Sequence, residues 1–159
     1  MKRVLDIKVK LDIIEESMLC DWQKEVIDIC NTEPHPRHIH WYWGGVGKSC
    51  LMKYILHHFG PKAVLLGGAS SKNAICSIAS SIKETGIHPE IVLINIYWNK
   101  VSYSILEEIK DGLMFSGKPD YRTILMNIPH VFILANYPPE AYEGLISDDK
   151  LQIHEIQSL

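Results

Sequence analysis

The chain has 159 residues, of which 47% are hydrophobic and 22% charged, proportions that are typical of one folded globular domain. Its net charge of −3 excludes a uniformly basic surface, so any contact with nucleic acid must come from a local basic patch. The four cysteines form no Cys-x-x-Cys pair, which argues against a cysteine-based zinc site, and no apolar run reaches the roughly 18 residues of a membrane span, so we expect a soluble, intracellular protein without membrane contact.

The N-terminal part of the chain precedes the first predictable helix. Residues 1–18 alternate charged and β-branched residues and predict a strand or an arm. We therefore treat residues 1–20 as an N-terminal arm or linker, followed by one domain over residues 21–159. Apolar residues at helical spacing then predict a helix from Asp21 to Ile29, with Asp21 as its N-cap. A proline-containing turn ends this helix.

A glycine-rich segment lies between a predicted strand over residues 37–43 and a predicted helix over residues 50–58. It comprises Gly44, Gly45, Val46, Gly47, Lys48, Ser49 and Cys50. Small residues let backbone N–H groups converge on phosphate oxygens, and the following helix directs its positive end at them. In such a loop Lys48 reaches the β and γ oxygens of ATP, and the hydroxyl of Ser49 ligates Mg²⁺. The full pattern requires a further glycine five positions before Gly47, where this chain has Tyr42.

Strands and helices alternate after this loop. We expect strands over residues 63–66, 91–96, 130–135 and 151–156, and helices over residues 70–84 and 103–115. This order predicts an α/β fold of the P-loop NTPase type, a three-layer sandwich with helices on both faces of a central, mostly parallel sheet. Ligands of such sheets bind beyond the carboxyl ends of the strands, where the loop, Asn95 and Asn136 are expected to meet.

Four segments carry a family resemblance. They are Asp21-Trp22-Gln23-Lys24-Glu25-Val26, Ile39-His40-Trp41-Tyr42-Trp43 before the Gly-Lys-Ser loop, Leu106-Glu107-Glu108-Ile109-Lys110-Asp111-Gly112 leading to Ser116-Gly117-Lys118, and Phe132-Ile133-Leu134-Ala135-Asn136-Tyr137-Pro138-Pro139. Together they resemble the helicase half of Rep proteins from small circular single-stranded-DNA viruses of the nanovirus and circovirus type.

The resemblance implies a superfamily 3 helicase domain with an AAA+-type core. Such domains work as rings, commonly hexamers, that use ATP and Mg²⁺ to move along single-stranded DNA during rolling-circle replication. The family's N-terminal nuclease domain, with its His-x-His metal site and Tyr nucleophile, is not expected in this chain. If the chain is a viral protein, the resemblance implies that it works in the host nucleus. If it has another origin, we expect it in the cytoplasm or the nucleus.

The family's roles transfer to the positions that match its motifs. Lys48 and Ser49 match the phosphate loop, and Asn136 matches the sensor that reads the γ-phosphate and orients the attacking water. Lys118 matches the basic residue of the DNA-contacting loop. Together with Lys110 and Arg122, Lys118 is expected to form a basic strip along a central pore. Ordinary solvated helix charges are the alternative interpretation of these three residues.

The chain also departs from the family pattern at functional positions. Asn95 stands where the family has an Asp that holds the Mg²⁺-bound water shell. An amide keeps one acceptor oxygen but lacks the negative charge, so hydrolysis is expected to be slowed. Lys150 stands near the position of a trans-acting arginine finger and offers the charge without the planar fork of arginine. The loop before Gly47 is also shorter than in most relatives.

Two other functions remain open at this point. The first is a nucleotide- or nucleic-acid-binding module that assembles without turning over ATP, which Asn95 favours. The second is a small-molecule or nucleoside kinase, which fits less well because no arginine-rich lid follows the loop.

Aromatic and histidine residues near the loop have alternative interpretations. The alternating aromatics Trp41, Tyr42 and Trp43 are expected to pack in the core, with base stacking as the alternative. Tyr97 and Trp98 follow a central strand and are candidates for contact with adenine or another base. His38 and His40 resemble a metal-binding pair in spacing, but we expect them to belong to the strand that enters the loop.

Overall fold

The structure is a computed structural model that describes residues 11–97, 100–117, 122–140, 142 and 144–157. Its helices are α1 (Asp21–Cys30), α2 (Lys48–Phe59), α3 (Asn73–Thr85) and α4 (Tyr103–Asp111), with short 3₁₀ turns η2 (Glu16–Met18) and η3 (Gly60–Lys62). Its strands are β1 (Ile39–Trp43), β2 (Ala63–Leu66), β3 (Ile91–Ile96), β4 (Leu113–Phe115), β5 (Thr123–Leu125), β6 (His130–Ala135) and β7 (Leu151–Glu155). Within the described part of the chain, no helix combines the length and the apolarity needed to cross a bilayer.

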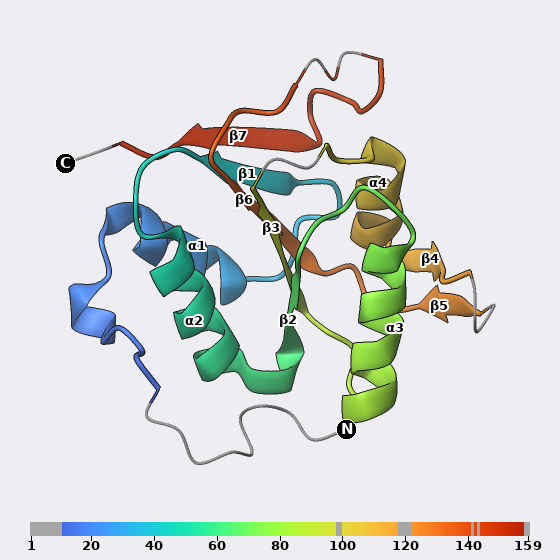
Figure 1. Cartoon of the computed structure of the whole chain (residues 1–159), viewed down its shortest axis with the longest axis horizontal. Coiled ribbons are helices and arrows are strands. Elements are labelled where there is room, and N and C mark those ends of the chain that lie inside the picture. The colour runs from blue at the N-terminus through green and yellow to red at the C-terminus, as the bar shows by residue number, and fades with distance from the viewer. Residues whose placement is uncertain (1–10, 98–99, 118–121, 141, 143, 158–159) are drawn as a thin grey trace.

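Five parallel strands form the central sheet, in the order β2-β3-β6-β1-β7. Helices α1 and α2 cover one face and α3 and α4 cover the other, while β4 and β5 form a small antiparallel ribbon at the side of the sheet (Figure 1). The predicted three-layer α/β sandwich is therefore confirmed. The predicted strands over residues 63–66, 91–96 and 130–135 are confirmed with the same bounds.

The predicted end of one helix and the predicted N-cap of another were wrong. The helix predicted to reach Phe115 ends at Asp111, because Gly112 takes a left-handed backbone conformation (φ 71°) and turns the chain into β4. The N-cap of α1 is Cys20 rather than Asp21, and the backbone N–H of Cys20 donates to the side chain of Gln23 at 2.9 Å. A glutamine three residues into the helix thus completes a capping box.

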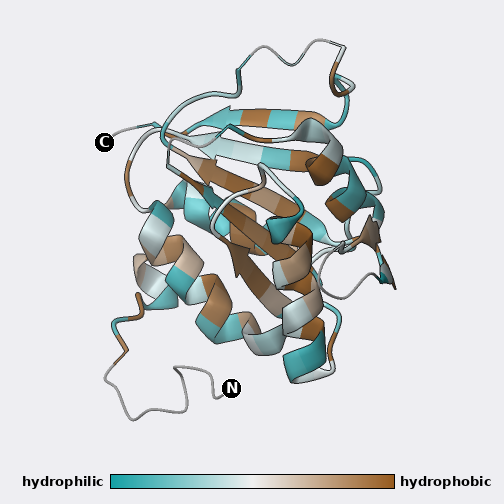
Figure 2. Cartoon of the chain, turned by 45° about the vertical axis from the view of Figure 1, so that its right-hand side comes forward, coloured by the Kyte–Doolittle hydropathy of each residue, from teal (hydrophilic) through white to brown (hydrophobic). Residues whose placement is uncertain are grey.

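The sheet divides the hydrophobic core into two parts. Its central strands are almost wholly apolar (Figure 2), as expected for parallel strands covered on both faces. Alternate residues of β6 face opposite sides, so Val131 and Ile133 pack toward α3 and α4 while Phe132 packs toward α1 and α2. Trp41 and Tyr42 are 1% and 2% exposed, which confirms that they belong to the core, and the half-buried Trp43 packs against it.

His40 lies in a row of stacked rings on the α1 and α2 face of the sheet. Its ring centroid lies 5.3 Å from that of Phe132 and 5.6 Å from that of His154. Burial, followed by the positive charge of His154, lowers the pKa of His40 from 6.5 to about 4. Smaller contributions of the same sign come from His38, Lys110 and His130. The folded protein therefore favours neutral His40.

We expect the free energy of unfolding to fall as the pH is lowered from about 6.5 to about 4, because the unfolded chain binds a proton at His40 that the folded chain excludes. The contribution of His40 is of the order of 1–3 kcal/mol. His40→Leu should flatten this part of the profile, whereas His57→Leu, at an exposed histidine, should not. Urea denaturation between about pH 7 and about pH 4 measures the effect. Equal pH dependence in the native chain and His40→Leu would contradict this assignment.

Candidate nucleotide site

The glycine-rich loop joins β1 to α2 at the carboxyl edge of the sheet. Gly44, Gly45 and Gly47 have φ angles of 76°, 57° and 98°, a left-handed region in which glycine is favoured. Helix α2 begins at Lys48, directly after Gly47, so the unpaired N–H groups of its first turn lie next to the loop. Backbone N–H groups and the positive end of the helix dipole at one place form an environment suited to an anion.

Two of the loop glycines are closely covered by other parts of the chain. A Cβ atom at Gly45 would overlap the side chain of Ile156, and a Cβ atom at Gly47 would lie 2.8 Å from Nε2 of Gln23. Ile156 also donates its backbone N–H to the carbonyl of Trp43 at 2.9 Å. The loop is thus held between the first helix and the segment that follows β7.

Gln23 supplies the polar part of this support. The side chain is 3% exposed, and its Nε2 donates to the carbonyl of Gly47 at 2.8 Å while its Oε1 accepts from the N–H of Cys20. Sequence reasoning assigned no role to Gln23. One signal was present: Gln23, Val26, Ile27 and Cys30 are the buried positions of α1, so a polar residue occupies the first position of an apolar stripe.

Lys48 folds back over the loop. Its Nζ donates to the carbonyls of Gly44 at 2.6 Å and Gly45 at 3.3 Å, and burial lowers its pKa. Among the described residues, no carboxylate forms an ion pair with Lys48. Ser49 and Cys50 are exposed on the first turn of α2. The ammonium group can therefore move its hydrogen bonds from these carbonyls to an anion bound in the loop.

Asn95 and Asn136 reach the same edge of the sheet. Asn95 is the second-last residue of β3 and pairs with Leu134, while Asn136 directly follows Ala135, the end of β6. The N–H of Gly44 donates to the carbonyl of Ala135 at 3.1 Å, which ties the start of the loop to the residue before Asn136. Ile94 and Ile96 face α3 and α4, so strand alternation places Asn95 on the α2 side. Lys48, Ser49, Asn95 and Asn136 thus share the carboxyl edge.

Lys150 lies at the opposite edge of the sheet. Its carbonyl accepts from the N–H of Ile39 at 2.7 Å, where β1 begins, and its Nζ lies 3.6 Å from Oε1 of Glu107. Parallel β1 and β7 therefore separate Lys150 from the loop of its own chain by the full length of a strand.

The prediction that Lys110 contacts nucleic acid was wrong. Its side chain is 2% exposed, and its Nζ donates to the carbonyl of Pro129 at 2.8 Å in a buried contact between α4 and the chain entering β6. Burial lowers the pKa of Lys110 to about 8. The group stabilises the packing of α4 and is not available to a phosphate. Lys118, the other residue predicted to contact nucleic acid, lies outside the described residues, as does Trp98.

Metal-binding potential at this edge is limited. The described residues contain no cluster of three or more His, Cys, Asp or Glu side chains suited to a metal ion. His40 Nδ1 lies 3.4 Å from His154 Nε2, and His38 stacks on His35, so the two predicted strand histidines point to different neighbours. Among the described residues, Ser49 offers a hydroxyl oxygen beside the loop, and Asn95 and Asn136 offer amide oxygens at the same edge. This set of three fits a magnesium ion whose other ligands are phosphate and water, but it contains no carboxylate.

The chain is similar to viral replication proteins. It is 26% identical over 135 residues to the master replication protein of Banana bunchy top virus, covering 83% of this chain and 44% of that protein. Matches to the master replication proteins of Milk vetch dwarf virus and Subterranean clover stunt virus are also 26% identical and cover 82% and 83% of this chain. The chain spans less than half the length of these relatives. No family model matches it.

We expect Gln23→Leu to lower the free energy of unfolding by about 1–3 kcal/mol, because the N–H of Cys20 and the carbonyl of Gly47 lose a buried partner. Amide exchange within residues 44–49 should also accelerate. Gln152→Leu is a matched control, since Gln152 donates to the Asp149 carbonyl at an exposed position. That change should cost less than about 0.5 kcal/mol. Equal losses in urea denaturation, with unchanged exchange in the loop, would contradict the supporting role of Gln23.

Proposed function

We propose that this chain is the nucleotide-driven unit of a Rep-related replication protein, which binds ATP with Mg²⁺ and couples its hydrolysis to movement along single-stranded DNA. The observation that carries the proposal is the loop itself. Three glycines with positive φ connect a buried parallel strand directly to a helix N-terminus, with the Lys48 ammonium held over them. The match to viral master replication proteins along most of the chain supports the connection with replication.

Each residue at the carboxyl edge has a role in this proposal. Lys48 exchanges its bonds to loop carbonyls for bonds to the β and γ oxygens, and the free N–H groups of α2 surround the phosphates. Asn136 donates to the γ-phosphate and accepts from the attacking water, which an amide does with one side chain. Ser49 would hold Mg²⁺, whose charge offsets that of the phosphates. Asn95 would hold water near such a metal ion through its amide oxygen.

Two further parts of the proposal concern assembly and DNA. Lys150 lies at the far edge of the sheet, so a finger role would place it in the site of a neighbouring copy within a ring, and a hexamer is the form that the family resemblance implies. The β4–β5 ribbon projects from the side of the core (Figure 1), and Lys118 belongs to the segment between its strands. We propose that this segment contacts single-stranded DNA.

A second candidate function is a module that binds nucleotide without turnover. The specific observation in its favour is Asn95 at the end of β3, where no negative charge attracts a divalent cation. Phosphate binding by the loop does not depend on that charge. The two candidates therefore differ in hydrolysis and not in affinity.

The first experiment measures binding of a fluorescent ATP analogue. Lys48→Ala should weaken binding by about ten- to hundredfold, because a hydrogen bond from a charged donor contributes about 1.5–3 kcal/mol. Lys53→Ala removes an exposed lysine from the same helix and should leave the affinity unchanged. Equal affinity of the Lys48→Ala and native chains would overturn the proposed nucleotide site.

Turnover then separates the two candidate functions. Mg²⁺-dependent ATP hydrolysis is measured with single-stranded DNA present in the native chain, Asn95→Asp and Lys48→Ala. Native turnover above the Lys48→Ala background supports the motor. Recovery only in Asn95→Asp indicates a motor fold disabled at its metal-water position. If the native chain binds ATP but none of the three chains hydrolyses it, the result supports the binding module.

A further inference from the structure

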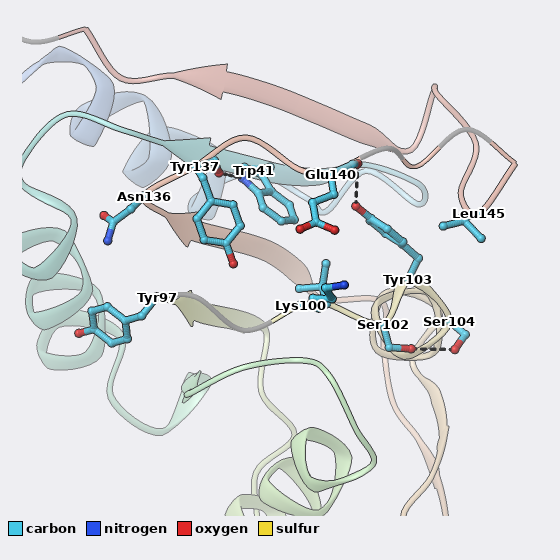
Figure 3. A pocket seen from close by; sticks show the side chains of 11 residues that line it. Trp41, Tyr97, Lys100, Ser102, Tyr103, Ser104, Asn136, Tyr137, Glu140 and Leu145 are labelled. Atoms are coloured by element: carbon cyan, nitrogen blue, oxygen red, sulfur yellow. Dashed lines mark hydrogen bonds between the residues drawn. The ribbon is translucent and has the colours of Figure 1, made fainter.

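A cavity separate from the phosphate loop opens at the carboxyl edge of the sheet. Its volume is about 740 Å³, within the roughly 300–1,000 Å³ range of small-ligand sites. Its walls come from Trp41 of β1, Tyr103 of α4 and the segment from Tyr137 to Glu140 after β6 (Figure 3). Trp41 and Tyr103 belong to the core on the α3 and α4 side of the sheet. The cavity and α2 therefore lie on opposite faces.

The aromatic walls are fixed before any ligand binds. Nε1 of Trp41 donates to the carbonyl of Tyr137 at 3.0 Å, and the rings of these two residues pack edge to face at 6.4 Å. The hydroxyl of Tyr103 donates to the carbonyl of Glu140 at 3.3 Å. The segment from Tyr137 to Glu140 is thus held at both ends by side chains of the walls. Such preorganisation reduces the entropy lost when a flat ligand enters.

Two opposite charges face the cavity. The carboxylate of Glu140 projects into the space between the rings of Tyr137 and Tyr103, and Lys100 lies across from it (Figure 3). Burial, followed by the negative charge of Glu140, raises the pKa of both tyrosines, so their hydroxyls remain neutral. The cavity therefore combines π surfaces, one strong acceptor and one cation.

We infer that this cavity binds one nucleotide of single-stranded nucleic acid, with the base against the tyrosine rings, its amino edge toward Glu140 and its phosphate toward Lys100. The inference rests on the proposed function in making the ligand a nucleic acid. Aromatic side chains stack on bases, and a carboxylate accepts from their N–H groups. A cationic side chain from a partner protein would be attracted by Glu140 but repelled by Lys100. A nucleotide offers N–H donors of its base to the carboxylate and a phosphate to the ammonium group.

The carboxylate also makes the cavity selective. Guanine offers two adjacent donors, N1–H and the exocyclic amine, that a carboxylate accepts together, whereas thymine offers one N–H between two carbonyls. Guanine is therefore the preferred base. Asn136 lines the cavity as well, so an occupied cavity touches the residue assigned to the γ-phosphate. Binding of a strand is in this way linked to the nucleotide site.

The test uses fluorescence anisotropy of the full chain without ATP. The probes are labelled oligo(dT) of about twelve nucleotides and the same strand with one central guanine, a length that spans one site. We expect the guanine strand to bind about five- to hundredfold more tightly, the range for a good bidentate contact to a base. Glu140→Gln should abolish this preference. Glu84→Gln, at an exposed glutamate on α3, should retain it.

The outcomes are distinct. Equal affinity of the native chain for both strands, or a guanine preference that survives Glu140→Gln, overturns the inference. Sedimentation that shows self-association of the native chain and its loss in Glu140→Gln also overturns it, because a second copy then fills the cavity. ATP binding without any oligonucleotide binding leaves the nucleotide site standing and removes the cavity. A preference for guanine without ATP binding supports the cavity as a binding site and overturns the proposed nucleotide site.

Discussion

The site depends on the tight packing of other parts of the chain against two glycines of the loop. Gly45 lies under Ile156 and Gly47 lies under Gln23, so neither position accepts a side chain without displacing another part of the fold. These two covering residues come from segments more than a hundred residues apart in the chain. The loop backbone is therefore fixed by tertiary packing as well as by its own glycines. A loop that has Tyr42 in place of the first glycine of the full phosphate-binding pattern depends more on such support to keep its N–H groups convergent.

Strand order explains why residues distant in sequence meet at this loop. Parallel pairing of β1 with β6, and of β6 with β3, sets Trp43, Ala135 and Ile96 side by side. The first residue beyond β6 is Asn136, and Asn95 precedes the end of β3 by one position. A one-residue shift in the pairing of β3 would turn Asn95 to the α3 and α4 face, away from the loop. The buried aliphatic residues on both sides of β3 make such a shift costly, so packing of the core also fixes the face on which Asn95 lies.

Much of this fold could be predicted from the sequence, because continuous apolar runs such as Ile91–Ile96 are characteristic of buried parallel strands. The glycine-rich loop and its position after a strand could also be predicted from the sequence. What could not be predicted depended on tertiary contacts. A lysine on a helix is usually solvated, yet the ammonium group of Lys110 donates a hydrogen bond to the carbonyl of Pro129 in a buried contact. The role of Gln23 arises only when α1 packs against the loop, and the end of α4 depended on how Gly112 turns the chain into a ribbon.

Lys48, the N-terminus of α2 and the two asparagines at the ends of β3 and β6 form a part of the carboxyl edge that favours phosphate over metal. Lys48 and the N-terminus of α2 provide positive potential, and Asn95 and Asn136 at the ends of β3 and β6 carry neutral amides, whereas β7 ends in the exposed Glu155 opposite Trp43. A phosphate therefore enters a field with no carboxylate at position 95 to oppose it. In the proposed site a divalent cation would find the reverse, since its protein ligands would be the Ser49 hydroxyl and an amide oxygen, and most of its attraction would come from the phosphates. Aspartate at position 95 would leave the first interaction nearly unchanged and would strengthen the second. In the proposed function, the identity of this one residue would thus decide whether the loop acts mainly as a binding site or as part of a motor.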